Sequence, residues 1–168
     1  MVPNIFQDPN VRSEMMLTSD NVREAVDEYG DMLYRLCLVM LRNTADAEDA
    51  VQETFIKYML SSPPFNDDEH EKAWLITVAS NKCRDMLRSW KRHCTESEDI
   101  LRNYPADSDD KGVFEALTEV PEKFRIVLTL HYVEGYKVDE IAKILGKTPS
   151  AVKMRLAKGR KLLEEKLK

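Results

Sequence analysis

The side chains best suited to binding another molecule are the cations near the C-terminus. Residues 141–168 carry nine Lys and Arg against two Glu, and the cations recur at helical spacing. Lysine and arginine donate hydrogen bonds to phosphates and to base edges in the major groove of DNA. The side chains left on the outer face of this segment are Ser150, Lys153, Met154, Arg155, Ala157, Lys158 and Arg160. We interpret the segment as a DNA-binding helix with Lys153 and Lys158 as leading donors; an ordinary solvated cationic helix is the alternative.

Amide and guanidinium groups form a second set in the middle of the chain. Counted from Asn81, the residues Arg84, Asp85, Arg88 and Arg92 follow at offsets of 3, 4, 7 and 11, which places them on one face of a helix. Asn and Arg can hydrogen-bond an exposed base or hold a phosphate. A salt-bridged surface, in which Asp85 and Arg88 neutralise each other, fits the same spacing equally well.

An acidic set precedes the two basic ones. Residues 43–71 hold eight Asp and Glu against one Lys. Its outward polar side chains are Asp46, Glu48, Asp49, Gln52 and Glu53. Acidic residues are common in the first turn of a helix, where they interact favourably with the helix dipole. Spacing alone therefore leaves two interpretations, a solvated helix start and a docking surface.

Three amphipathic helices are expected to position the acidic set and the amide–guanidinium set. The first covers about residues 21–42, and the second follows Asn43 and Thr44, whose side chains can cap it. Asp68 and Glu71 have capping-box spacing at the start of a third helix, which ends near Trp90. The apolar stripe of the first helix includes Val22, Ala25, Val26, Tyr29 and Leu33, and that of the second includes Ala47, Ala50, Val51, Phe55, Tyr58 and Met59. Together the three helices predict one small bundle.

The cationic segment is expected to be the second helix of a helix-turn-helix. Residues 138–145 read as a two-turn amphipathic helix that Gly146 closes. Thr148 can cap the following helix, and Pro149 suits its first position. Val152 and Leu156 then point inward and leave the polar side chains outside. A helix, a glycine turn and a cationic helix together are typical of a major-groove reader.

The chain is therefore predicted to be all-α, with two small helical domains joined by a flexible linker. Residues 1–19 are expected to be a poorly ordered N-terminal extension, residues 20–92 the first domain, residues 93–111 the linker and residues 112–168 the second domain. The linker is polar and acidic, and it has no sustained apolar stripe.

Several classes of protein are disfavoured by what the sequence lacks. No apolar run approaches the roughly 18 residues of a membrane helix, and the first residues do not resemble a signal peptide, so we expect a cytoplasmic protein without direct membrane insertion. The three cysteines are too widely spaced for a disulfide framework or a thiolate zinc site. The three histidines are scattered and no catalytic motif is present. We expect no enzyme activity, no catalytic residue, no metal and no cofactor.

Three segments in this order resemble the bacterial extracytoplasmic-function (ECF, group 4) sigma factors of RNA polymerase. DAEDAVQETFIKY (46–58) is similar to the polymerase-binding segment of sigma region 2. AWLITVASNKCRDMLRSWKR (73–92) is similar to the helix that opens and reads the minus-10 element, and VDEIAKILGKTPSAVKMRLAKGRKLL (138–163) is similar to region 4. The resemblance implies that residues 20–92 are a region 2 domain and residues 112–168 a region 4 domain of an alternative sigma factor.

The resemblance also implies partners and a role for each polar set. Asp46, Glu48, Asp49, Gln52 and Glu53 become contacts to core RNA polymerase. Asn81, Arg84, Arg88 and Arg92 become contacts to melted minus-10 promoter DNA, and Ser150, Lys153, Met154, Arg155, Ala157 and Lys158 become minus-35 contacts. A membrane-associated anti-sigma factor is a further expected partner.

The main alternative is a transcriptional regulator that works without polymerase. Such a helix-turn-helix protein would bind a palindromic duplex as a dimer. Protection of duplex DNA by the chain alone favours that regulator, whereas transcription restored by adding the chain to core polymerase favours a sigma factor.

Overall fold

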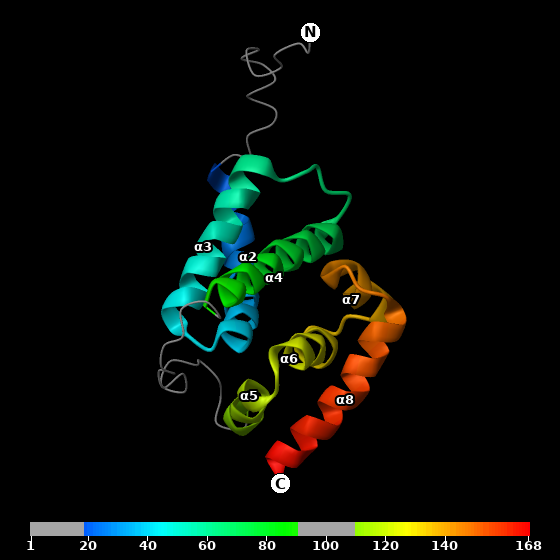
Figure 1. Cartoon of the computed structure of the whole chain (residues 1–168). Coiled ribbons are helices and arrows are strands. Elements are labelled where there is room, and N and C mark those ends of the chain that lie inside the picture. Colours follow the sequence, from blue (N-terminus) through cyan, green and yellow to red (C-terminus); the bar gives the residue numbers. More distant parts are fainter. Residues whose placement is uncertain (1–18, 91–109) are drawn as a thin grey trace.

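The computed structural model describes residues 19–90 and 110–168, and its regular elements there are all helical (Figure 1). In chain order they are α2 (Ser19–Leu41), α3 (Thr44–Ser61), α4 (Asp68–Trp90), α5 (Asp110–Glu119), α6 (Glu122–Leu128), the π-helical turn η3 (Thr129–Val133), α7 (Val138–Leu145) and α8 (Pro149–Leu167). The predicted all-α class is confirmed. The expected N-terminal extension and linker fall almost wholly outside the described residues.

Helices α2, α3 and α4 form a first unit around one apolar core. Leu36 of α2 and Leu75 and Ile76 of α4 are fully buried in it. Helix α3 contributes the small side chains of Ala47 and Ala50, also fully buried, which let it lie close to its neighbours. The first unit is the bundle that the apolar periodicity predicts.

The helix starts in this unit confirm one predicted cap and correct another. The Asn43 side chain accepts a hydrogen bond of 3.0 Å from the Asp46 backbone N–H, as predicted for the start of α3. The capping box assigned to α4 is wrong, because Asp67 is the residue that accepts from the His70 N–H, at 2.7 Å. Glu71 instead accepts a hydrogen bond from the Tyr58 hydroxyl and so joins α4 to α3.

The second unit, α5 to α8, contains the predicted helix-turn-helix. Helix α7 ends at Gly146, whose φ of 61° lies in the left-handed region that glycine adopts without strain. The Thr148 hydroxyl accepts a hydrogen bond of 3.2 Å from the Ala151 N–H, and Pro149 opens α8. Val152 and Leu156 are buried, as predicted. The local signals of this segment therefore all agree with the structure.

Helix α8 lies unusually close to α6 at Gly159. A Cβ atom added there would lie 3.2 Å from Cγ and Cδ1 of Leu128 and 3.2 Å from Cβ of Phe124. Both neighbours are buried, so they have little room to move. The close approach fixes how α8, and with it the cationic face, is held on the unit.

We therefore expect Gly159→Leu to lower the free energy of unfolding by about 1–3 kcal/mol, because overpacking forces shifts in a filled core. Chemical denaturation of the full chain measures the change. Ala157→Leu is the matched control, since it enlarges an exposed position of the same helix. Equal stability of the two variants would show that the α6–α8 contact is not tight.

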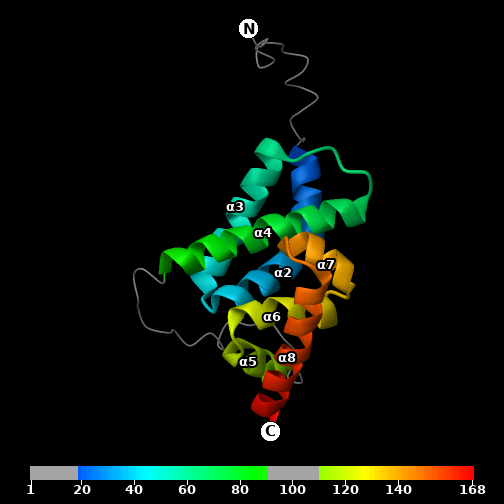
Figure 2. The same cartoon turned by 45° about the vertical axis from the view of Figure 1, so that its right-hand side comes forward.

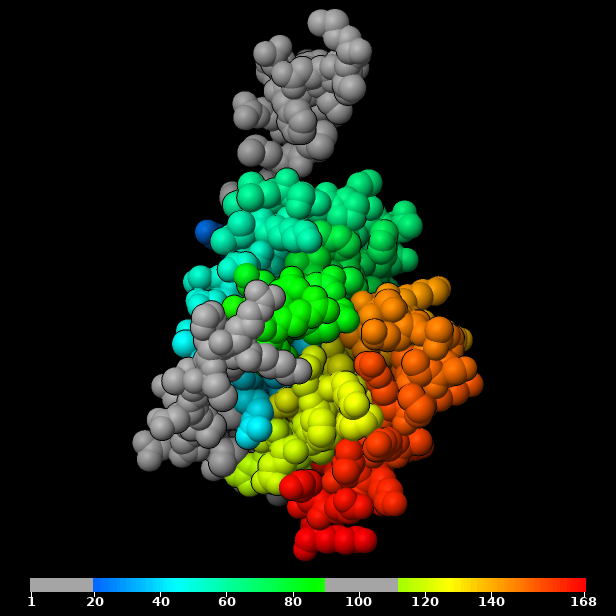
Figure 3. Space-filling view, viewed as in Figure 1, coloured from blue at the N-terminus to red at the C-terminus, as the bar shows by residue number. Residues whose placement is uncertain are grey.

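The two units pack against each other, which the sequence pattern does not predict. Helix α4 lies against α7, and α2 lies against α5 and α6 (Figure 2). The buried apolar side chains of both units belong to one continuous cluster. Figure 3 shows the surface of α4 meeting those of α6 and α7. The position of the second unit decides which faces of the first are free.

Candidate nucleic-acid and protein interfaces

The outer face of α8 presents most of the predicted DNA-binding set to solvent. Ser150, Lys153, Met154, Ala157 and Lys158 are exposed. Arg155 is half-buried and lines a pocket against the first unit. The free face combines two lysines with small and apolar side chains, which suits phosphates and base edges in a major groove.

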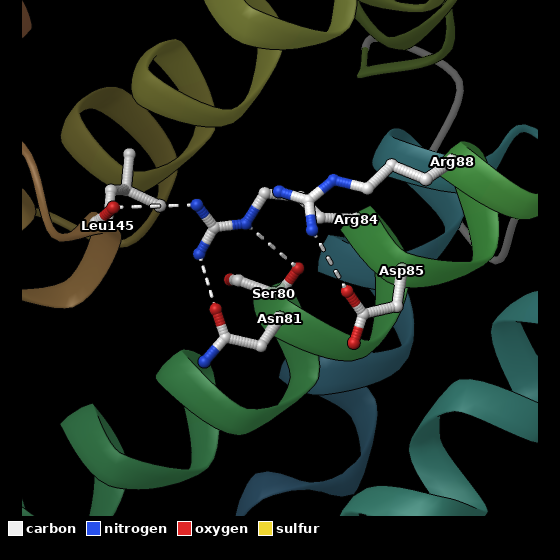
Figure 4. A network of polar contacts seen from close by, with 6 residues as sticks. All are labelled: Ser80, Asn81, Arg84, Asp85, Arg88 and Leu145. Atoms are coloured by element: carbon white, nitrogen blue, oxygen red, sulfur yellow. Dashed lines mark hydrogen bonds and ion pairs between the residues drawn. The ribbon is translucent and has the colours of Figure 1, made fainter.

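The polar face of α4 is a hydrogen-bonded network centred on Arg84 (Figure 4). Its Nη2 donates to Asn81 Oδ1 at 2.5 Å and its Nε to the Ser80 carbonyl at 3.4 Å. Its Nη1 reaches out of the unit and donates to the Leu145 carbonyl of α7 at 3.4 Å. Arg84 is therefore half-buried and already engaged with the second unit.

The other members of this set form hydrogen bonds within α4 or fall outside the described residues. Arg88 and Asp85 form an exposed ion pair of 3.3 Å, the arrangement that the alternative interpretation predicts. Asn81 is exposed beside Arg84, and Arg92 falls outside the described residues. The structure thus brings Asn81 and Arg84 together and leaves Arg88 beside them on the same helix face.

The acidic face of α3 is largely open. Glu48, Asp49 and Gln52 are exposed, and Asp46 is half-buried in the first turn. Glu53 forms an ion pair with Lys82 of α4, so its charge is partly compensated. Negative charge is therefore concentrated at the N-terminal half of α3.

An apolar groove lies beside this face, between α2 and α3, and sequence reasoning missed it. It has a volume of about 780 Å³, and its lining includes Val26, Gln52, Ile56 and Met59. Val26 is 42% exposed, Ile56 50% and Met59 42%. The assignment of Val26 and Met59 to the inward stripes is therefore wrong. The signal was in the sequence, since adjacent Phe55 and Ile56 make the apolar stripe of α3 wider than a three-helix core can cover.

A second contact joins the two units next to α4. Lys72 Nζ lies 4.0 Å from Glu134 Oε2 and 5.5 Å from the centroid of the Tyr136 ring. Burial raises the pKa of Glu134, while the charges of Lys72 and Arg35 oppose that rise. We call the arrangement in which the two units pack against each other closed. It places the Glu134 carboxylate near two cations of the first unit.

A metal site needs several ligating side chains close together, and a membrane span needs a long apolar helix. Within residues 19–90 and 110–168, no group of three or more His, Cys, Asp or Glu side chains is arranged to hold a metal ion. Cys37 and Cys83 are free and buried. None of the described helices combines the length and the apolar character needed to cross a bilayer.

Comparisons with known proteins cover both units. The family model "Sigma-70 region 2" matches residues 25–93, and "Sigma-70, region 4" matches residues 112–163. The ECF RNA polymerase sigma factor SigW of Bacillus subtilis is 29% identical over 89% of this chain and 90% of its own length. The RNA polymerase sigma factor CarQ of Myxococcus xanthus is 32% identical over 76% of this chain and 78% of its own length.

Solved structures share the fold. The sigma factor RpoE of Bartonella quintana, solved with the anti-sigma factor NepR, has a TM-score of 0.75 at 23% identity, over 88% of this chain and 97% of its own. CnrH, solved with the cytosolic domain of CnrY, has a TM-score of 0.65 at 23% identity, over 88% of each chain. Both family models match in the order that the resemblance requires and together cover more than half of the sequence, so the chain belongs to the sigma-70 family of RNA polymerase sigma factors, in its extracytoplasmic-function group.

Proposed function

We propose that the chain divides promoter recognition among three surfaces: the outer face of α8 for the minus-35 element, the polar face of α4 for the minus-10 element, and the α2–α3 side of the first unit for core RNA polymerase. As an ECF sigma factor it directs transcription initiation at promoters, while the polymerase makes the RNA. The main observation behind this proposal is that α8, the second helix of a helix-turn-helix, has an exposed cationic face. It supports duplex binding by the second unit.

Ser150, Lys153, Met154, Arg155, Ala157 and Lys158 are the proposed minus-35 contacts. Lys153 and Lys158 are the two exposed cations of this set. Groove contacts of this kind discriminate between bases by about 1–3 kcal/mol each, and phosphate contacts release counterions. Binding through them should therefore be sensitive to salt.

We expect the double change Lys153→Ala and Lys158→Ala to lower run-off transcription at least about tenfold, because two groove-facing donors are lost. The slope of log affinity against log salt, measured for polymerase holding the variant on promoter DNA, should fall by about one for each lysine that contacts a phosphate. Lys161→Ala, on the same helix but outside the proposed set, is the matched control. An equal loss in the control variant would mean that α8 acts only through its overall charge.

Asn81, Arg84, Arg88 and Arg92 are the proposed contacts to the melted minus-10 strand. Unstacking a base costs a few kcal/mol, so amide and guanidinium groups that hold the free base can trap melted DNA. In the closed arrangement Arg84 donates to Leu145 of the second unit instead. The free chain is therefore expected to bind promoter DNA weakly until polymerase separates the units. Tight, sequence-specific binding by the isolated chain in a gel-shift assay would contradict this.

Asp46, Glu48, Asp49, Gln52 and Glu53, with the neighbouring apolar groove, form the proposed polymerase-binding surface. The acidic half of α3 suits basic side chains, and Val26, Ile56 and Met59 suit the apolar face of a helix. A rim of charge beside an apolar centre is the usual make-up of a protein interface. The clamp helices of the largest polymerase subunit are the expected partner.

Run-off transcription with core polymerase and fragmented genomic DNA tests this function directly. We expect discrete transcripts only when both chain and core are present, and their start sites reveal the promoter. Duplex protection in a footprint without polymerase, together with no transcript, would instead favour the autonomous helix-turn-helix regulator. The match to both sigma-70 family models disfavours that alternative.

An anti-sigma factor is the remaining proposed partner. The sigma factor RpoE was solved with the anti-sigma factor NepR, and CnrH was solved with the cytosolic domain of CnrY. We infer that a membrane-associated anti-sigma factor holds this chain in the cytoplasm, and that the chain itself does not insert into the membrane. Affinity capture of the tagged chain from membrane and soluble fractions, with mass spectrometry, tests the inference.

A further inference from the structure

Cationic side chains from both units converge on one pocket at the unit interface. The pocket has a volume of about 230 Å³ and lies among α4, α6, the turn after α7 and α8. Its cations are Arg84 and Arg88 from the first unit and Lys123, Lys147 and Arg155 from the second. Closing the units therefore brings like charges together.

The positive charge of the pocket is poorly compensated. Glu122 is the one acidic residue in its lining, and it also acts on the buried guanidinium of Arg125. Within the described residues, Lys123, Lys147 and Arg155 form no ion pair. The pocket is thus a cationic cavity for which the described part of the chain supplies little counter-charge.

The pocket cations of the first unit, Arg84 and Arg88, are not neutralised within the pocket either. Arg84 donates only to the uncharged acceptors of Ser80, Asn81 and Leu145. Arg88 has Asp85 as its partner, but the pair is exposed and Asp85 lies outside the pocket lining. An exposed ion pair of this kind contributes little to stability, because solvent screens both charges.

The size and chemistry of the pocket point to a small anion with several charges. Its volume corresponds to about eight water molecules at roughly 30 Å³ each, the scale of two or three linked phosphates. Guanidinium groups bind phosphate oxygens in a bidentate way, and lysines add point charges. A DNA duplex is far too wide to enter, so the occupant is a free anion or the phosphate chain of a nucleotide.

We propose that this pocket binds a small polyphosphate group and that the bound anion holds the two units closed. The proposal rests on the proposed function, because Arg84 and Arg88 also belong to the proposed minus-10 set. An anion that binds only the closed form stabilises it by mass action and competes with promoter capture. The concentration of the polyphosphate ligand in the cell would then set the fraction of the chain that is available to polymerase.

Calorimetric titration of the full chain with tripolyphosphate, at constant ionic strength, tests the binding site. We expect one saturable site and a rise in melting temperature of about 3 °C at ten times the Kd. The double change Lys123→Glu and Lys147→Glu should weaken binding at least about tenfold, because charge reversal removes and opposes two ligands. Lys143→Glu, exposed on α7 and outside the pocket, is the matched control. Equal weakening in both variants, or no saturation, would overturn the site.

A second measurement separates the closing effect from binding alone. Dyes placed by Lys57→Cys on α3 and Lys161→Cys on α8, in a Cys94→Ser background, report the distance between the units by energy transfer. Tripolyphosphate should raise transfer in this chain and leave it unchanged when Lys123→Glu and Lys147→Glu are added. Unchanged transfer in the parent chain would overturn the closing role.

Comparison of ligands identifies the source of the phosphate. Pyrophosphate, tripolyphosphate, ATP and GTP are titrated beside sulfate. Tighter binding of the nucleotides assigns the pocket to nucleotides, and tighter binding of tripolyphosphate assigns it to inorganic polyphosphate. Equal binding of all five anions, sulfate included, would overturn the proposal. Binding of the unmodified chain to core polymerase, measured without nucleotides or added anion, is the independent check, since its failure would count against the sigma-factor function and not against the pocket.

Discussion

The substitution Ile56→Glu is expected to weaken binding to core RNA polymerase at least about 30-fold, the effect of removing one apolar hot spot. Ile56 is 50% exposed in the α2–α3 groove, beside Gln52 and Met59. A carboxylate there stays hydrated in the free chain, so the free energy of unfolding should not fall. On the polymerase complex, the same carboxylate would be buried among apolar groups without a partner. Calorimetric titration of core enzyme and thermal denaturation of the chain measure the two effects.

Leu60→Glu is the matched control for this prediction. Leu60 lies one turn further along α3, is 66% exposed and does not line the groove. The Leu60→Glu variant should bind polymerase as tightly as the unmodified chain does. If Ile56→Glu binds normally, the groove is not part of the interface and the acidic face of α3 carries the contact alone.

The second large effect is expected from tying the units together. Lys72 and Glu134 face each other across the interface, so the pair Lys72→Cys and Glu134→Cys can be joined by a cleavable bis-maleimide linker in a Cys94→Ser background. With the units joined, transcription should fall at least about tenfold, because α7 then stays over the Arg84 region of α4. The DNA-reading faces cannot separate to span two promoter elements.

Cleavage of the bis-maleimide cross-link should restore transcription. This result distinguishes the effect of joining the units from any damage caused by the substitutions. Each single variant carrying the maleimide adduct should transcribe almost normally. Full activity of the joined chain would show that polymerase accepts the closed arrangement, and that Arg84 is not needed for promoter capture.

Sequence signals proved most accurate where the interaction is local. The Asn43 cap of α3, the left-handed Gly146 and the Thr148 cap of α8 are each decided within four residues, and each was predicted correctly. The cap of α4 was misplaced by one residue, because Asp67, another acidic residue just before Asp68, accepts from the His70 N–H. Glu71, the expected capping-box partner, bonds to Tyr58 of another helix, a contact that no local pattern indicates.

The candidate surfaces were predicted in their polar parts and missed in their apolar part. Charged residues at helical spacing identify an outer face whatever the rest of the chain does, so the sets on α3 and α8 were found. The exposure of Val26, Ile56 and Met59 depends on how wide a core the other helices provide. Apolar periodicity alone assigns such residues to the interior.

The sequence by itself determined the helices, their caps, the helix-turn-helix and the family of the chain, because each depends on short-range spacing or on motifs in order. Tertiary structure alone decided that the two units close on each other, that Arg84 donates to Leu145, and that cations of both units share one pocket. Those contacts join residues far apart in the chain, and their geometry follows from packing two apolar surfaces together, which no local pattern encodes.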